Sequence, residues 1–159
     1  MNVKLLMADE NKEAIEKLQA AFADHPELCA RQLEPSEIPK LQELDALYLT
    51  LPAAERWNPQ LLFYESQVLK TRPEDKDWPR HIVTGIAMDP NDPRASNREA
   101  ELELVIKAVL NAVESYNKES SSPIKTVGFW TRDLRINRMD ASAAGEIIKS
   151  VYEEHFHRR

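Results

Sequence analysis

The sequence predicts an α/β fold in three layers, with a mostly parallel or mixed sheet and helices on both of its faces. Short apolar runs of strand length alternate along the chain with longer segments of helical period. Several of these runs are apolar at successive positions, which is typical of strands covered on both faces. The length of 159 residues suits a hydrophobic core of ordinary size, so one domain is expected over residues 1–159.

Three apolar runs lie in the first half of the chain, at residues 3–8, 28–33 and 45–51, and we expect a strand at each. Between the first two, apolar residues recur at helical spacing. The core-facing stripe of that helix consists of Ala14, Ile15, Leu18, Ala21 and Phe22. Asp9 or Asn11 can cap its first turn, because both side chains accept hydrogen bonds from free backbone N–H groups.

The segment between the third and fourth strands is the least regular part of the sequence. Pro52 stops the third strand, and apolar residues near helical spacing favour a helix over residues 58–70. Residues 71–80 are polar and contain two prolines, so we expect an exposed loop there. Trp57 and Trp78 lie in this segment and could pin it to the core or anchor a partner.

The second half repeats the strand, loop and helix order. Residues 81–88 and 125–131 are expected to be strands. Ser96, with Glu99 three residues later, has the spacing of a capping box at the start of the long helix between them. A loop rich in arginine follows the last strand, and Asp140 can cap the final helix.

Composition excludes several classes of function. The formal net charge of −6 opposes general binding to nucleic acid, which requires a surplus of Lys and Arg. No apolar run approaches the roughly 20 residues of a membrane helix. The single cysteine, Cys29, and the absence of a signal-peptide pattern favour a cytoplasmic protein. The three glycines are too far apart for a glycine-rich phosphate loop.

Candidate ligand-binding residues follow the predicted strands, because ligands of such sheets bind at the carboxyl ends of the strands. Arg132 and Arg135 precede the last helix and could bind an anion there, or could pair with neighbouring acids. Asp89 could belong to a cation site, although turn formation explains it better. No nucleophile, acid–base pair or metal-ligand spacing stands out, so we expect no catalytic residue, metal or cofactor.

The chain resembles the macro domain family over about residues 28–157. The resemblance is carried by the sequence Ile86-Ala87-Met88-Asp89-Pro90, the long helix led by Asn97, and the strand Asp45-Ala46-Leu47-Tyr48-Leu49 followed by Pro52. It implies a macro domain-like fold that binds a ligand of the ADP-ribose type. The family's asparagine after the third strand and its glycine-rich diphosphate loop are replaced here by other residues, which implies a module without catalytic activity.

We therefore expect a nucleotide-like or other phosphorylated small ligand between the loops after the third and fifth strands. Arg132 and Arg135 would neutralise its phosphate, Thr131 would form a hydrogen bond, and Thr50 and Asp89 would edge the cleft. The alternative is an interaction or assembly module that keeps the fold without a working pocket and binds a protein partner. An enzyme with another mechanism stays open, with no residue to assign to it.

Overall fold

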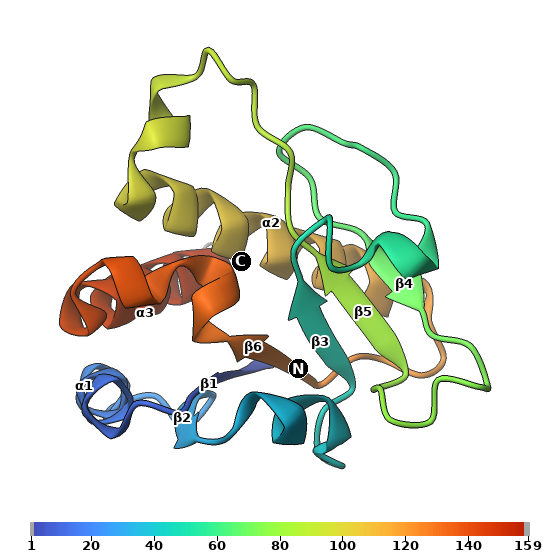
Figure 1. Cartoon of the computed structure of the whole chain (residues 1–159), viewed down its shortest axis with the longest axis horizontal. Coiled ribbons are helices and arrows are strands. Elements are labelled where there is room, and N and C mark those ends of the chain that lie inside the picture. Colours follow the sequence, from blue (N-terminus) through green and yellow to red (C-terminus); the bar gives the residue numbers. More distant parts are fainter. Residues whose placement is uncertain (1, 158–159) are drawn as a thin grey trace.

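The computed structural model describes residues 2–157 and has an α/β architecture (Figure 1). Its strands form one six-stranded sheet in the order β2-β1-β6-β3-β5-β4. β4 is antiparallel to β5, and the other neighbours are parallel, so the sheet is mixed. The strands are β1 (Lys4–Asp9), β2 (Leu28–Gln32), β3 (Ala46–Leu49), β4 (Val68–Lys70), β5 (His81–Thr84) and β6 (Thr126–Trp130). The α-helices are α1 (Lys12–Ala21), α2 (Arg98–Glu119) and α3 (Ala141–His157).

Alternation along the strands divides the core into two clusters, one on each face of the sheet. In β1, Leu5 and Met7 belong to one cluster, whereas Leu6 and Ala8 belong to the other. The first face is covered by α1, α2 and α3, with α3 packed against both of the others. The second face is covered by short 3₁₀ helices and irregular chain, which contribute Ile38, Leu44, Ala54 and Trp57. The expected second helical layer is therefore built from 3₁₀ turns.

No α-helix forms over residues 58–70, and this prediction was wrong. Asn58 and Tyr64 have left-handed backbone conformations, with φ of 55° and 62°, which a right-handed helix cannot contain. Gln67 and Gln60 bond to each other through side chain and backbone, and residues 68–70 pair with β5 as β4. Pairing at the sheet edge thus overrides a periodicity that suited either a helix or a strand.

The N-cap residues predicted from the sequence are confirmed for two of the three helices. Asn11, one of the two candidates, accepts a hydrogen bond from Ala14 N, and Asp140 accepts one from Ala143 N at 3.3 Å. The predicted capping box at Ser96 was wrong. Asn97 is the cap of α2 and accepts from Ala100 N, whereas the Ser96 hydroxyl donates to the Pro93 carbonyl inside a preceding 3₁₀ turn. An amide oxygen one residue later caps the helix equally well.

Both tryptophans of the irregular segment pack on the second core cluster. Trp57 is 8% exposed, and its ring meets that of Trp78 edge to face at 5.0 Å. The Trp57 indole N–H donates to the buried carboxylate of Asp75 at 2.9 Å. Hydrogen bonds from Arg72 N and from Trp57 hold the pKa of Asp75 below its ordinary value. The tryptophans therefore fix the loop at residues 71–80 to the core.

The described part of the chain, residues 2–157, contains no helix with the length and apolarity needed to cross a bilayer.

Candidate functional site

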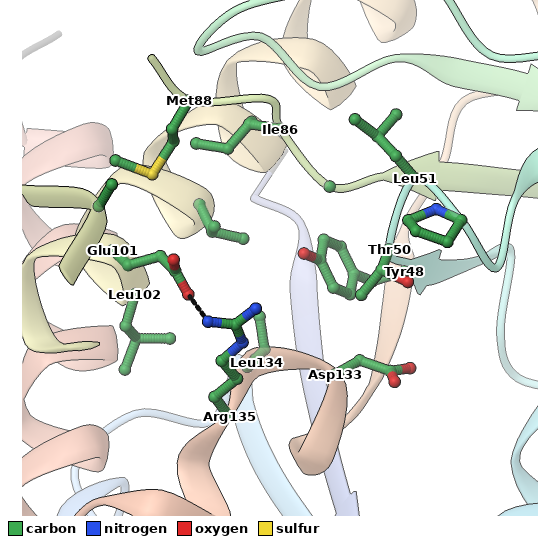
Figure 2. A pocket seen from close by; sticks show the side chains of 14 residues that line it. Tyr48, Thr50, Leu51, Ile86, Met88, Glu101, Leu102, Asp133, Leu134 and Arg135 are labelled. Atoms are coloured by element: carbon green, nitrogen blue, oxygen red, sulfur yellow. Dashed lines mark ion pairs between the residues drawn. The ribbon is translucent and has the colours of Figure 1, made fainter. Parts of the chain in front are cut away.

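A pocket of about 270 Å³ opens at the carboxyl ends of β3, β5 and β6 (Figure 2). The loops after these three strands form its floor and two walls, and the first turns of α2 form the third wall. Its apolar lining consists of Leu51, Pro52, Ile86, Met88, Ala95, Leu102, Val105 and Leu134. The ends of three predicted strands thus meet at one pocket, as expected for parallel strands.

Tyr48, near the end of β3, contributes a hydroxyl to the pocket from the core. The residue is 3% exposed, and its ring stacks on Phe129 with ring centres 5.3 Å apart. No hydrogen bond joins the Tyr48 hydroxyl to any residue of 2–157. Burial, together with the negative charges of Asp133 and Glu101, raises the pKa of Tyr48 above its ordinary value, so the hydroxyl stays protonated.

Because Gly85 has no side chain, the Tyr48 hydroxyl can lie directly beside its backbone. A Cβ at position 85 would lie 2.8 Å from the Tyr48 hydroxyl oxygen and 3.4 Å from the Thr50 Cα. Because the Tyr48 ring is fixed against Phe129, the hydroxyl has little room to move away. The glycine is therefore required by close approach, since its own φ is not positive.

Arg135 and Glu101 face each other across the pocket. Their side chains form an ion pair at 3.7 Å that joins the first turn of α2 to the loop after β6 (Figure 2). Arg135 is 57% exposed in its side chain and has a left-handed backbone with φ of 59°. A non-glycine residue in this conformation carries a modest strain, and such strain is concentrated at functional sites.

Asp133 supplies a second carboxyl group to the pocket. It is half-buried, and burial raises the pKa of its carboxyl group above the ordinary value. Within residues 2–157 its carboxyl group has neither a hydrogen-bond donor nor a cationic partner. The pocket therefore presents one cation, two carboxyl groups and one phenol on an apolar background.

The predicted site residues separate in the structure. Thr50 and Arg135 line the pocket, whereas Asp89 follows the lining residue Met88 and accepts a hydrogen bond from Asn91 N in a turn. Thr131 is fully buried, and its hydroxyl donates to Asp9 Oδ2 at 2.6 Å.

Arg132 lies beside a different cavity of about 300 Å³, next to the start of α1 and α3. It pairs with Glu10 at 3.0 Å and lies over the Trp130 ring. Residues three apart share one side of a 3₁₀ helix, and 131–134 form such a helix. Arg135, however, lies just beyond its end, and the left-handed backbone turns the side chain to the other pocket. The two arginines therefore do not converge on one anion.

Three pocket residues were not identified from the sequence. Tyr48 was interpreted only as part of a buried strand, and Asp133 only as an acid that could pair with the arginines, whereas Glu101 was assigned no role. Strand alternation already places Tyr48 on the helix-covered face. No sequence signal shows that its hydroxyl reaches the end of the core.

Comparison with family models, with curated proteins and with solved structures finds no match to this chain. Residues 2–157 contain no group of three or more His, Cys, Asp or Glu side chains placed to hold a metal ion.

Proposed function

We propose that the chain is a macro domain-like module without catalytic activity that binds a small phosphorylated, nucleotide-like ligand in the pocket beside Arg135. The observation that supports this proposal most directly is the position of the pocket at the carboxyl ends of three parallel strands, where α/β sheets bind nucleotides. The apolar wall formed by Leu51, Pro52 and Ile86 suits the face of a base.

The size of the pocket favours a mononucleotide over a dinucleotide. Its volume of about 270 Å³ falls just below the range of about 300–1,000 Å³ that is usual for drug-sized ligands. A ligand of the full ADP-ribose type would have to extend beyond the pocket. AMP is therefore our first probe, and ADP-ribose is the comparison.

Arg135 is the group that would hold the phosphate. Its pair with Glu101 is long, at 3.7 Å, and the Arg135 side chain is exposed, so the pair contributes little stability. A phosphate can accept two parallel hydrogen bonds from the planar guanidinium, which is a stronger interaction. The ligand would therefore displace Glu101 from Arg135, and Glu101 would then face the rest of the ligand.

The test is calorimetric titration with AMP, ADP-ribose and inorganic phosphate. Arg135→Ala should weaken AMP binding at least about tenfold, because a charge-assisted hydrogen bond contributes about 1.5–3 kcal/mol. Arg132→Ala is the matched control: this arginine is equally exposed and ion-paired, lies three residues away, and faces another cavity. Its affinity for AMP should stay within about twofold of the wild type. Equal losses in both variants, or no heat with any ligand, would contradict the proposal.

The alternative, an interaction or assembly module, is favoured by one observation. Leu61 and Phe63 are 71% and 55% exposed on a segment held in place by hydrogen bonds between Tyr64 N and the Ala87 carbonyl and between Gln60 and Gln67. If this pair mediates assembly with a second copy, the wild type should show a concentration-dependent mass in sedimentation, and Leu61→Ser/Phe63→Ser should stay monomeric. A wild type that is monomeric at all concentrations would exclude that form of the alternative.

A further inference from the structure

Two polar groups of the pocket have no partner within residues 2–157, the Tyr48 hydroxyl and the Asp133 carboxyl. Tyr48 lies near the end of β3 and Asp133 on the loop after β6; in Figure 2 the Tyr48 hydroxyl points toward the middle of the pocket, and the Asp133 carboxyl group points away from Arg135. Tyr48 is almost completely buried. Its ring lies in the core, whereas its hydroxyl faces the pocket without a partner from the protein and can bond to a ligand there.

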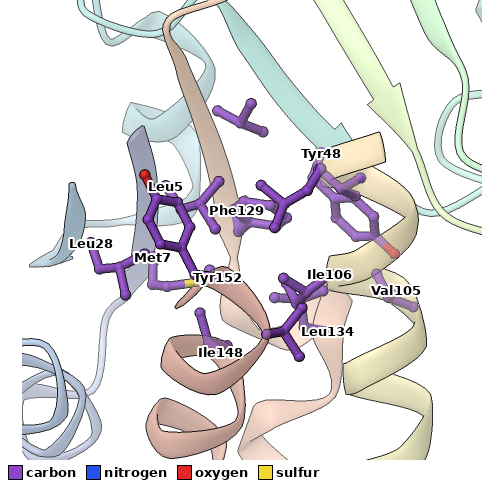
Figure 3. Packing of buried hydrophobic residues seen from close by; sticks show 14 of the residues in the cluster. Leu5, Met7, Leu28, Tyr48, Val105, Ile106, Phe129, Leu134, Ile148 and Tyr152 are labelled. Carbon is purple, nitrogen blue, oxygen red and sulfur yellow. The ribbon is translucent and has the colours of Figure 1, made fainter. Parts of the chain in front are cut away.

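The surrounding structure fixes the Tyr48 hydroxyl at the pocket. The ring is fixed between Phe129 and Val105 in the core (Figure 3), and Gly85 leaves the space beside the oxygen open. Asp133 is likewise held with its carboxyl group half-buried, which opposes its ionisation. Two polar groups without a partner from the protein thus line one pocket. A ligand in the pocket can supply the hydrogen-bond partners that both groups lack.

We infer that Tyr48 and Asp133 determine ligand specificity by binding the hydroxyl groups of a pentose, so that the ligand is a ribonucleotide or another pentose phosphate. This inference rests on the proposed function and specifies the ligand of that same pocket. Hydroxyl groups fit because each can donate to a carboxylate, and a phenol can both donate to and accept from a hydroxyl.

The charges of the pocket assign the two ends of the ligand. Asp133 has no neighbouring cation to offset a second negative charge, so a phosphate is repelled from it and is attracted to Arg135. The sugar of a nucleoside monophosphate lies next to its phosphate, which places the hydroxyl groups within the same small pocket. Glu101, once displaced from Arg135, adds a further acceptor on the opposite wall.

The experiment compares AMP with 2′,3′-dideoxy-AMP, which has the same base and phosphate and no ribose hydroxyl. The wild type should bind AMP at least about tenfold more tightly, because a site built to bond hydroxyl groups rejects the analogue that lacks them. Tyr48→Phe and Asp133→Asn should each weaken AMP binding about tenfold or more, with the affinity for the dideoxy compound changed less than about twofold. Arg135→Ala should weaken both ligands alike.

A second readout uses the empty protein and separates a role in binding from a role in folding. Tyr48→Phe and Asp133→Asn should leave the melting temperature unchanged or raise it at pH 7.5, because the first removes a hydroxyl without a partner from the protein and the second removes a half-buried charge. Lower melting temperatures in both variants would show that the two groups hold the fold together, and would overturn the inference.

The pH dependence provides a third readout. The acceptor at Asp133 is lost when its carboxyl group is protonated, and burial raises the pKa of that group. Glu101, Arg135 and Tyr48 face the same pocket. The preference for AMP over the dideoxy compound should therefore fall as the pH is lowered through the raised pKa of Asp133, and should fall less in Asp133→Asn. Taking the ratio of the two affinities cancels the titration of the phosphate, which both ligands share.

The outcomes distinguish this inference from the proposed function. Equal affinity for the two ligands, still dependent on Arg135, would overturn the role of Tyr48 and Asp133 and leave the phosphate site standing. Absence of binding by both would overturn the inference and the proposed function together.

Discussion

Phe129→Ala is expected to lower the free energy of unfolding by about 3–5 kcal/mol, the usual effect of truncating a buried aromatic residue. Phe129 is 0% exposed and lies on β6, in the cluster between the sheet and the helices (Figure 3). The stacked ring of Tyr48 would lose its neighbour, so a cavity would form directly behind the pocket floor. The pocket should therefore weaken together with the fold.

The measurement is urea denaturation followed by circular dichroism, with Phe63→Ala as the control. Phe63 loses the same atoms but is 55% exposed, so its change in stability should stay within about 0.5 kcal/mol. A loss below about 1.5 kcal/mol at Phe129, or equal losses at both positions, would show that the region collapses into the cavity or is packed more loosely than the structure indicates.

The sequence was sufficient for the α/β architecture because burial and periodicity agree along most of the chain. In β1, for example, the residues that face either side of the sheet are apolar, and the structure places Leu5 and Leu6 in separate core clusters on opposite faces. The long helix α2 carries a clear apolar stripe, and its main contacts follow that stripe. Local preference and tertiary packing point to the same structure in these elements.

Residues 58–70 could not be predicted, because their local preferences do not decide between helix and strand. Exposure alternates from Leu61 to Glu65, which is the pattern of an extended segment, yet the residues exposed by this alternation include Leu61 and Phe63. The chain is held by contacts distant in sequence, such as that of Tyr64 with Asp92 at 2.6 Å. Such distant partners cannot be predicted from the residues of the segment alone.

The sequence predicted where the pocket lies, but it did not predict which residues line it. The carboxyl ends of the strands follow from parallel topology, and Thr50 and Arg135 lie there. The separation of Arg132 from Arg135 depends on a single left-handed residue, and neither arginine is a type that favours that conformation. The placement of the Tyr48 hydroxyl in the pocket depends on Gly85, just after β5, which the pairing of β3 with β5 brings near.

Gly145→Ala is expected to lower the free energy of unfolding by about 2 kcal/mol, although alanine is the better helix former. Gly145 lies on α3 where that helix crosses α1, and a Cβ there would be 2.6 Å from the Cβ of Ala21 and 3.5 Å from Leu18 Cδ2. A methyl group on a helix backbone cannot rotate away, so the two helices must separate. Overpacking of this kind costs about 1–3 kcal/mol, which exceeds the gain of up to about 1 kcal/mol in helix propensity.

The cause can be isolated by moving the methyl group from one helix to the other. Ala21→Gly alone should cost at most about 1 kcal/mol, because Ala21 is the last residue of α1. The double variant Gly145→Ala/Ala21→Gly has one methyl group at the crossing, as the wild type has, and should be about as stable as Ala21→Gly alone. The resulting coupling of about 2 kcal/mol would come from the contact between the helices, since residues in contact are not additive. Additive losses in the cycle would instead attribute the effect to α3 itself, and the close approach of α1 and α3 at Gly145 would not be what requires a glycine.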